Sequence, residues 1–272
     1  MGIQLEMISG RTLAFKGEKR VETVCQNKNA TTHSLTVQPL LNASGKLCLP
    51  VLTCFYEPAG APQCFQRDLS PYKNLKCVWT TSGKMNKEIM KNWMKEDFIS
   101  TADKNSVLFL DSWSGFNEAK LIPEVKANMI HILTIPKKTT GKIQPCDIGF
   151  NRYFKSLYRT TEDKIRRLHP EFMLTKRSNV GLLLNQTVEQ FCAPRYSSLI
   201  AHSFIKAGFF NHDYEEYQTP DDYCYHFKKV GARCDLKRCG KLAFIKCSWC
   251  EKFFCFDDYF VKIHCCRNNN VR

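Results

Sequence analysis

The sequence predicts an α/β protein with a mixed sheet, a helical extension and a small metal-binding module at its carboxyl end. Three observations lead to this expectation. Apolar runs of strand length come first along the chain, and they then alternate with amphipathic helical patterns. Seven of the 15 cysteines fall between Cys234 and Cys266. With 272 residues, of which 43% are hydrophobic, the chain is long enough to bury a sizeable core.

The amino-terminal segments predict strands, a loop and one helix. Residues 21–25, 34–41 and 47–55 have the composition of strands, and a short turn containing glycine joins the last two as in a hairpin. Residues 57–70 are rich in proline, glycine and alanine and predict a loop. Beyond this loop, Asn86 is expected to cap a helix whose apolar side chains share one face.

The middle of the chain alternates strands with helices. Residues 105–110 form an apolar run that ends abruptly at Asp111, which is typical of a buried parallel strand that delivers a carboxylate to its C-terminal edge. A short helix is expected over residues 117–126 and a second apolar strand over residues 129–135. Asp147 then lies in the first turn of an amphipathic helix.

The chain is expected to divide into four parts. The α/β domain covers residues 1–160 and the helical extension residues 161–210, with a helix end at Gly208. An acidic and aromatic linker over residues 211–233 leads to the metal-binding module over residues 234–266.

The charge balance is strongly basic. Lysine and arginine number 40 against 26 aspartate and glutamate residues, a formal net charge of +14. Such an excess favours a polyanionic partner, usually nucleic acid, although an ordinary basic surface is the alternative. No apolar run reaches the roughly 18 residues that cross a bilayer, and the first twenty residues do not form a signal peptide. We therefore expect an intracellular protein with no membrane partner.

Asp111 and Asp147 are expected to converge. In an α/β sheet the C-terminal ends of strands and the adjoining helix N-termini gather on one side. Hard divalent cations such as Mg²⁺ prefer oxygen ligands, and two metal ions can activate the attacking oxygen and stabilise the leaving one in phosphoryl transfer. The alternative is a strand-end aspartate and an aspartate that only stabilises a helix N-terminus.

The sequence around both carboxylates resembles a known family. The stretches VLFLDSWSG and ILTIPKKTTGKIQPCDIGFNRYFKSLYR resemble the DDE-type transposases of the Tc1/mariner superfamily, specifically the pogo/Tigger-like branch with a DDE-1 endonuclease domain. RTLAFKGEKRV, at residues 11–21, is similar to the first hairpin of that family. The resemblance implies a ribonuclease-H-like sheet, with Asp111 as the second metal-binding acid and Asp147 as the third. The later motif is completed by Thr139, Thr140, Gln144 and Pro145.

The resemblance also implies that one acid is missing. In the family the first acid ends the first strand, just ahead of the segment that Gly2 begins here, so this acid and its strand would fall before Met1. Mg²⁺ binding should then be weak, and neighbouring strands should have unpaired edges. The implied protein is a nuclear, transposase-derived DNA-binding protein without strand-transfer activity. The alternative is a fragment of an active Mg²⁺-dependent transposase.

Two further groups of residues are candidates for binding. On the loop before Asp147, three lysines are candidates to hold DNA phosphates, and the alternative is a solvated basic turn. These lysines are Lys137, Lys138 and Lys142. At the carboxyl end, the cysteine spacing is similar to that of B-box cross-brace modules, which implies two interleaved zinc sites. The first site would use Cys234, Cys239, Cys255 and Asp258, and the second Cys247, Cys250, His264 and Cys266, with Cys265 competing for the last position. Such a module contacts either DNA or a protein partner.

Overall fold

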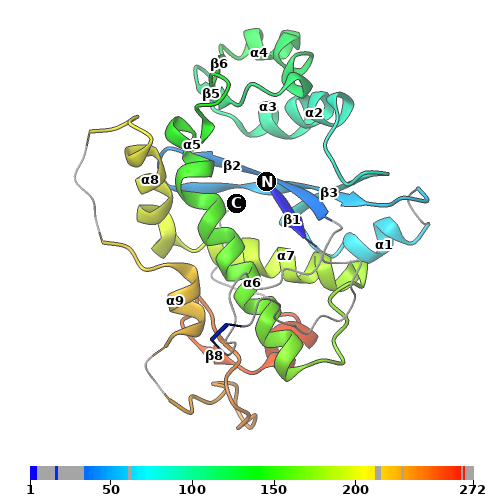
Figure 1. Ribbon diagram of the computed structural model, residues 1–272, viewed down its shortest axis with the longest axis vertical. Coiled ribbons are helices and arrows are strands. Elements are labelled where there is room, and N and C mark those ends of the chain that lie inside the picture. Colours follow the sequence, from blue (N-terminus) through cyan, green and yellow to red (C-terminus); the bar gives the residue numbers. More distant parts are fainter. Residues whose placement is uncertain are drawn as a thin grey trace.

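A four-stranded mixed sheet forms the centre of the protein in the computed structural model (Figure 1). Its order is β1 (Gly2–Gln4), β2 (Ser34–Asn42), β3 (Lys46–Tyr56) and β4 (Leu75–Thr80). The pairs β1–β2 and β2–β3 are antiparallel, whereas β4 runs parallel to β3. The structure describes residues 1–4, 16–17, 34–60, 63–211, 216–227, 230–264 and 266.

The predicted hairpin at β2 and β3 is confirmed, and its turn depends on Gly45. This residue has a φ of +86°, a conformation that glycine adopts without strain. A Cβ atom at this position would also lie 2.3 Å from the carbonyl oxygen of Ser197. The hairpin can therefore approach the helical layer only because position 45 has no side chain. The strand expected at residues 21–25 and the stretch at 11–21 lie mostly or wholly outside the described residues.

The next two strands form a separate sheet. β5 (Val107–Leu110) and β6 (His131–Thr134) are parallel, and within the described residues they pair only with each other. The expected strands are therefore present, but the expected single mixed sheet is divided. Helices α2 (Lys87–Trp93) and α4 (Pro123–Ala127) pack around them and enclose a second apolar core (Figure 1).

Local signals in this part of the chain explain the helix boundaries. The Oδ1 atom of Asn86 accepts a hydrogen bond of 2.9 Å from the amide of Ile89, so Asn86 caps α2 as predicted. The helix continues as a π-helical turn over Met94–Phe98 and ends in α3 (Ile99–Thr101). The prediction of one helix over residues 117–126 is wrong in its extent, because α4 begins only at Pro123. Proline has no backbone N–H to donate to a preceding helical turn, so it is favoured at the start of a helix.

Helices α6 (Asn151–Leu168), α7 (Arg177–Phe191) and α8 (Ser197–Lys206) pack against the four-stranded sheet (Figure 1). Helices are thus present in the predicted extension, although α6 begins before residue 161, and α8 is followed by Gly208 at a φ of +82°, as expected. None of the helices in the described ranges is long and apolar enough to cross a membrane.

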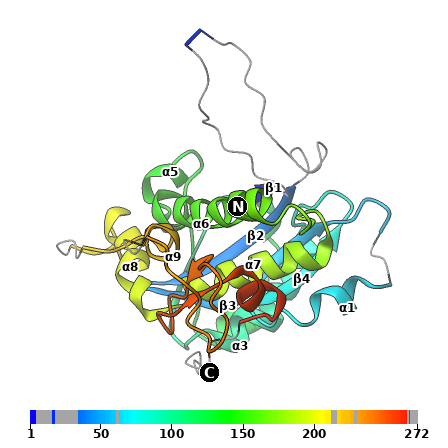
Figure 2. The same cartoon turned by 90° about the horizontal axis from the view of Figure 1, so that it is seen from below.

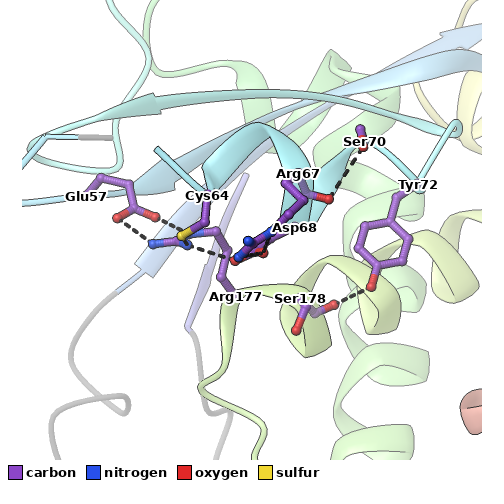
Figure 3. Close-up of polar contacts among 8 residues, drawn as sticks. All are labelled: Glu57, Cys64, Arg67, Asp68, Ser70, Tyr72, Arg177 and Ser178. Atoms are coloured by element: carbon purple, nitrogen blue, oxygen red, sulfur yellow. Dashed lines mark hydrogen bonds and ion pairs between the residues drawn. The ribbon is translucent and has the colours of Figure 1, made fainter. Parts of the chain in front are cut away.

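The first residue of α7 is tied to the end of β3 by ion pairs (Figure 3). Arg177 contacts Glu57 with its Nε and Nη2 atoms at 2.6 and 3.0 Å, and its Nη1 atom lies 3.1 Å from Asp68. Asp68 belongs to α1 (Phe65–Leu69), a short helix in the segment expected to be a loop. This clamp fixes the helical layer to the carboxyl end of a central strand.

The carboxyl-terminal module is part of the main core. α9 (Pro220–Tyr225) occupies the segment expected to be a linker, and its aromatic side chains are buried. The strands β7 (Ile245–Lys246) and β8 (Phe253–Phe254) form a small antiparallel pair. Figure 2 shows this segment, coloured orange to red, beside α7 and α9. The module shares one apolar cluster with the helical layer and the sheet.

Candidate carboxylate site and metal centres

Asp111 and Asp147 line the same cavity, which has a volume of about 1000 Å³ and lies between β2 and β5. Asp111 follows the last residue of β5, and its Oδ1 atom accepts a hydrogen bond of 3.0 Å from the amide of Trp113. Asp147 lies in a π-helical turn that leads into α6, after the short helix α5 (Thr140–Ile143). The fold thus brings both sequence-predicted carboxylates to one cavity.

Two amide side chains beside the carboxylates have unpartnered oxygen atoms. The Nδ2 atom of Asn151 donates a hydrogen bond of 2.8 Å to Oδ1 of Asp147. The Oδ1 atom of Asn151 and the Oε1 atom of Gln144 are buried and have no hydrogen-bonding partner among the described residues, and both residues line the cavity. Buried acceptors normally have a partner, so these two oxygens fit a cation or a donor from a ligand. Sequence reasoning gave Gln144 no role of its own and missed Asn151, one helical turn after Asp147.

Further charged groups line the cavity, among them the α-amino group of Met1 and the carboxylate of Asp103. Burial lowers the pKa of the Met1 α-amino group, while the nearby negative charges of Asp147 and Asp111 act in the opposite direction. Among the described residues, Asp103 is the remaining carboxylate of the cavity lining, and it precedes β5 whereas Asp111 follows it. The arrangement offers two carboxylates and two amide oxygens, which is the ligand chemistry of a hard divalent cation.

The three candidate lysines lie outside the cavity. Lys137, Lys138 and Lys142 are exposed in and beside α5, and none of them lines the cavity wall. In the described part of the chain they have no ion-pair partner. Their positive charges are therefore available to an anionic ligand beside the carboxylate site.

One group of four ligand atoms lies near the end of the chain. The structure brings Cys234, Cys239, Cys255 and Asp258 together, with all four ligand atoms within 4.8 Å of one another. Oδ2 of Asp258 lies 3.3 Å from Sγ of Cys234 and 3.1 Å from Sγ of Cys255. Hydrogen bonds from Cys239, Lys262 and Cys255 hold the pKa of the Asp258 carboxyl well below its usual range. This carboxylate is thus charged and directed at the thiols.

A second group of four ligand atoms lies closer to α7. It contains Cys247, Cys250, His264 and Cys266, again within 4.8 Å of one another. Hydrogen bonding from Cys247, together with His264, lowers the pKa of the Cys250 thiol below its usual range. Three sulfur atoms with one carboxylate, and three sulfur atoms with one imidazole, both match the tetrahedral donor sets of zinc. The two groups are those implied by the cross-brace spacing; Cys265 lies outside the described residues.

Residues of α7 support the second group, and sequence reasoning missed them. Gln190 contacts three residues of the module, namely Cys247, Ser248 and Tyr259. Trp249 donates a hydrogen bond of 2.7 Å from its indole nitrogen to the carbonyl of Glu189. Two buried glutamines, Gln186 and Gln190, stand four residues apart in this apolar helix, and that spacing was the available signal.

Comparisons with known proteins cover both parts of the chain. The family model described as DDE superfamily endonuclease matches residues 32–167, which is half of the 272 residues. The model described as Tc5 transposase C-terminal domain matches residues 204–266, a span that begins in α8 and includes both groups of candidate metal ligands. No significant match was found among curated proteins or among solved structures. The first match implies a ribonuclease-H-like fold for the α/β part, and the chain belongs to the DDE endonuclease superfamily.

Proposed function

We propose that this protein binds DNA at the cavity that holds Asp111 and Asp147, and that these carboxylates bind Mg²⁺ there. The observation that carries the proposal is the meeting of two carboxylates and two unpartnered amide oxygens in one cavity of a DDE-family chain. Mg²⁺, when bound, would supply positive charge for a DNA phosphate. The +14 net charge supports the same partner.

Basic residues around the cavity would contact further phosphates. We assign this role to Lys137, Lys138 and Lys142, which are exposed and have no ion-pair partner among the described residues. The first turns of α6 add Arg152, which is exposed, and Lys155, whose charge acts on the Met1 α-amino group inside the cavity. Such contacts position DNA without reading its sequence.

The protein is proposed to bind DNA without cutting it. Two-metal phosphoryl transfer needs ligands that hold both ions about 3.5–4 Å apart. In the described residues the cavity is lined by Asp111 at the C-terminal end of β5, by Asp147 in the turn before α6, and by Asp103 at the opposite end of β5. Weak occupancy by a single ion is therefore expected. An active enzyme is the second possibility, and the same experiment distinguishes the two.

A binding and cleavage assay with the full chain tests the proposal. Fluorescence anisotropy should show binding of a labelled duplex that weakens steeply as salt rises, because phosphate contacts release counterions. Asp111→Asn and Asp147→Asn should remove any Mg²⁺ dependence of this binding. Absence of DNA binding, or binding that salt does not affect, would contradict the proposal. Nicking or joining of DNA that needs Mg²⁺ and is lost in Asp111→Ala would show an active enzyme instead.

We further propose that the carboxyl-terminal module binds two zinc ions and acts chiefly within its own chain. Its second group packs on α7 through Gln190 and Trp249, so this face is already occupied. A separate protein-interaction function would have to use the remaining surface. A DNA-binding protein of transposase ancestry is also expected in the nucleus, which imaging of a fluorescent fusion tests directly.

A further inference from the structure

Trp113 is an exposed aromatic residue that the fold holds in one position beside Asp111. The residue is 39% exposed and lines the cavity. The backbone amide of Trp113 is fixed by its hydrogen bond to Asp111, and the ring lies edge-on against Phe116, with centroids 5.5 Å apart and an interplanar angle of 86°. A large apolar side chain that is both exposed and fixed is suited to binding a ligand.

The indole of Trp113 packs against Gly115, in the space that a side chain at position 115 would fill. A Cβ atom at position 115 would lie 2.2, 2.3 and 2.5 Å from three neighbouring atoms of the Trp113 six-membered ring. Nearly equal distances to adjacent ring atoms mean that the ring lies flat over the glycine. Any other residue would displace the indole. Because the ring is already held in place, a ligand that stacks on it loses little additional side-chain entropy.

The same cavity is too large and too apolar to serve phosphate groups and a metal ion alone. At about 1000 Å³ it is at the upper end of the range for small-molecule sites. Its wall includes Phe109, Phe209 and Phe210, and the rings of Phe109 and Phe209 lie 4.5 Å apart. Phe209 and Phe210 belong to the segment that matches the Tc5 transposase C-terminal domain. Residues from both of the family-matched segments, 32–167 and 204–266, thus contribute aromatic side chains to the cavity that holds the carboxylates.

We propose that Trp113 is a stacking platform for an unpaired nucleobase of DNA bound at the carboxylate site. This inference rests on the proposed DNA binding. A base that leaves the duplex would place its flat face on the indole, while the adjoining phosphate lies near Asp111 and the basic residues. Stacking on an aromatic side chain tolerates any base, because every base has a π-face.

Trp79 provides a matched control. It is 42% exposed, close to the value for Trp113, but it lies on β4 and does not line the cavity. The variants are Trp113→Ala, Trp113→Leu, Trp113→Phe and Trp79→Ala. Leucine keeps apolar volume without a π-face, and phenylalanine keeps a π-face. Thermal unfolding monitored by circular dichroism verifies that each variant is folded. If Trp113→Ala destabilises the loop, the comparison of Trp113→Leu with Trp113→Phe still tests the π-face.

The probe is a duplex with an unpaired 2-aminopurine at its end, titrated into the full chain. Removal of the platform in Trp113→Ala or Trp113→Leu should weaken binding by about 5- to 150-fold, since base stacking contributes ~1–3 kcal/mol. The slope of affinity against salt should not change, because phosphate contacts remain. Stacking should quench 2-aminopurine fluorescence in the unmodified chain, in Trp113→Phe and in Trp79→Ala.

Two results would overturn the inference, and they are distinguishable. If the unmodified chain binds the duplex and Trp113→Leu matches Trp79→Ala in affinity and quenching, Trp113 is not a stacking platform, while the proposed DNA binding stands. If the unmodified chain does not bind the duplex at any salt concentration, the proposed function fails and the platform fails with it.

Discussion

Gln190 and Tyr259 are joined by a buried hydrogen bond of 2.7 Å from the glutamine Nε2 atom to the phenolic oxygen. The Oε1 atom of the same glutamine accepts a hydrogen bond of 2.7 Å from the amide of Ser248, and its Nε2 atom lies 3.9 Å from Sγ of Cys247. Gln190 is only 1% exposed. Its amide therefore keeps its two shortest hydrogen bonds only while the carboxyl-terminal module is docked on α7.

Substitution of Gln190 by leucine should destabilise the protein. The change leaves the Ser248 amide and the Tyr259 hydroxyl without this partner in a buried site, and each such loss costs about 1–3 kcal/mol. We expect the free energy of unfolding to fall by about 2–4 kcal/mol in urea denaturation. The control is Asn185→Leu on the same helix, whose Oδ1 atom accepts a longer bond of 3.3 Å from the Asn74 amide. Equal effects of both changes would contradict the assigned role of Gln190.

Removal of metal should destabilise the whole chain and not the module alone. Phe244, Phe256 and Phe260 of the module belong to the same apolar cluster as α6 and α7. Structural zinc contributes directly to folding. A chelator should therefore lower the temperature of a single, shared unfolding transition in calorimetry, and elemental analysis should find two zinc ions per chain. Cys250→Ser should retain one ion. A main transition that the chelator does not shift would contradict this expectation.

Loss of Arg177 should weaken the attachment of α7 to β3 (Figure 3). Arg177→Met leaves the buried carboxylate of Glu57 without its cation and removes one of the two cations of Asp68, and we expect a loss of about 2–3 kcal/mol in the free energy of unfolding. Arg177→Lys should lose less, because lysine keeps the charge but not the two-point contact with Glu57. The control is Arg67→Met, since the Arg67 side chain is 79% exposed and its pair with Asp68 should contribute less than about 1 kcal/mol.

Asn151 should influence metal binding at the carboxylate site. Asn151→Ala removes the hydrogen bond that orients Asp147 and one unpartnered oxygen of the cavity. Groups that orient metal ligands typically contribute about 10- to 100-fold to metal affinity. We expect a loss of that size in Mn²⁺ titrations followed by electron paramagnetic resonance. Asn128→Ala, whose side chain bonds to the Glu124 carbonyl on α4, should not change the Mn²⁺ affinity. An unchanged affinity in Asn151→Ala, with binding lost in Asp147→Asn, would exclude this role.

Several elements could be predicted because their signals are local. The hairpin of β2 and β3, the cap at Asn86 and the helix end at Gly208 each depend on residues within a few positions of one another. A pair such as Cys247 and Cys250 is also a local signal, whereas the division of the eight candidate ligands into two interleaved groups was implied by the similarity to B-box modules. β4 was missed because its pairing with β3 is a long-range contact with little trace in its own pattern.

The sequence by itself determined the main strands around the site, the two acids and the candidate metal ligands, because side-chain type and short-range geometry specify them, while the grouping of those ligands was implied by the similarity to B-box modules. Only the tertiary structure decided that β5 and β6 leave the main sheet, that α9 replaces a linker, and that Trp113 lies on Gly115 beside an open cavity. The physical reason is that these features depend on packing between residues from distant segments. The two shortest hydrogen bonds of the Gln190 amide, for example, join it to Ser248 and Tyr259, more than fifty positions away.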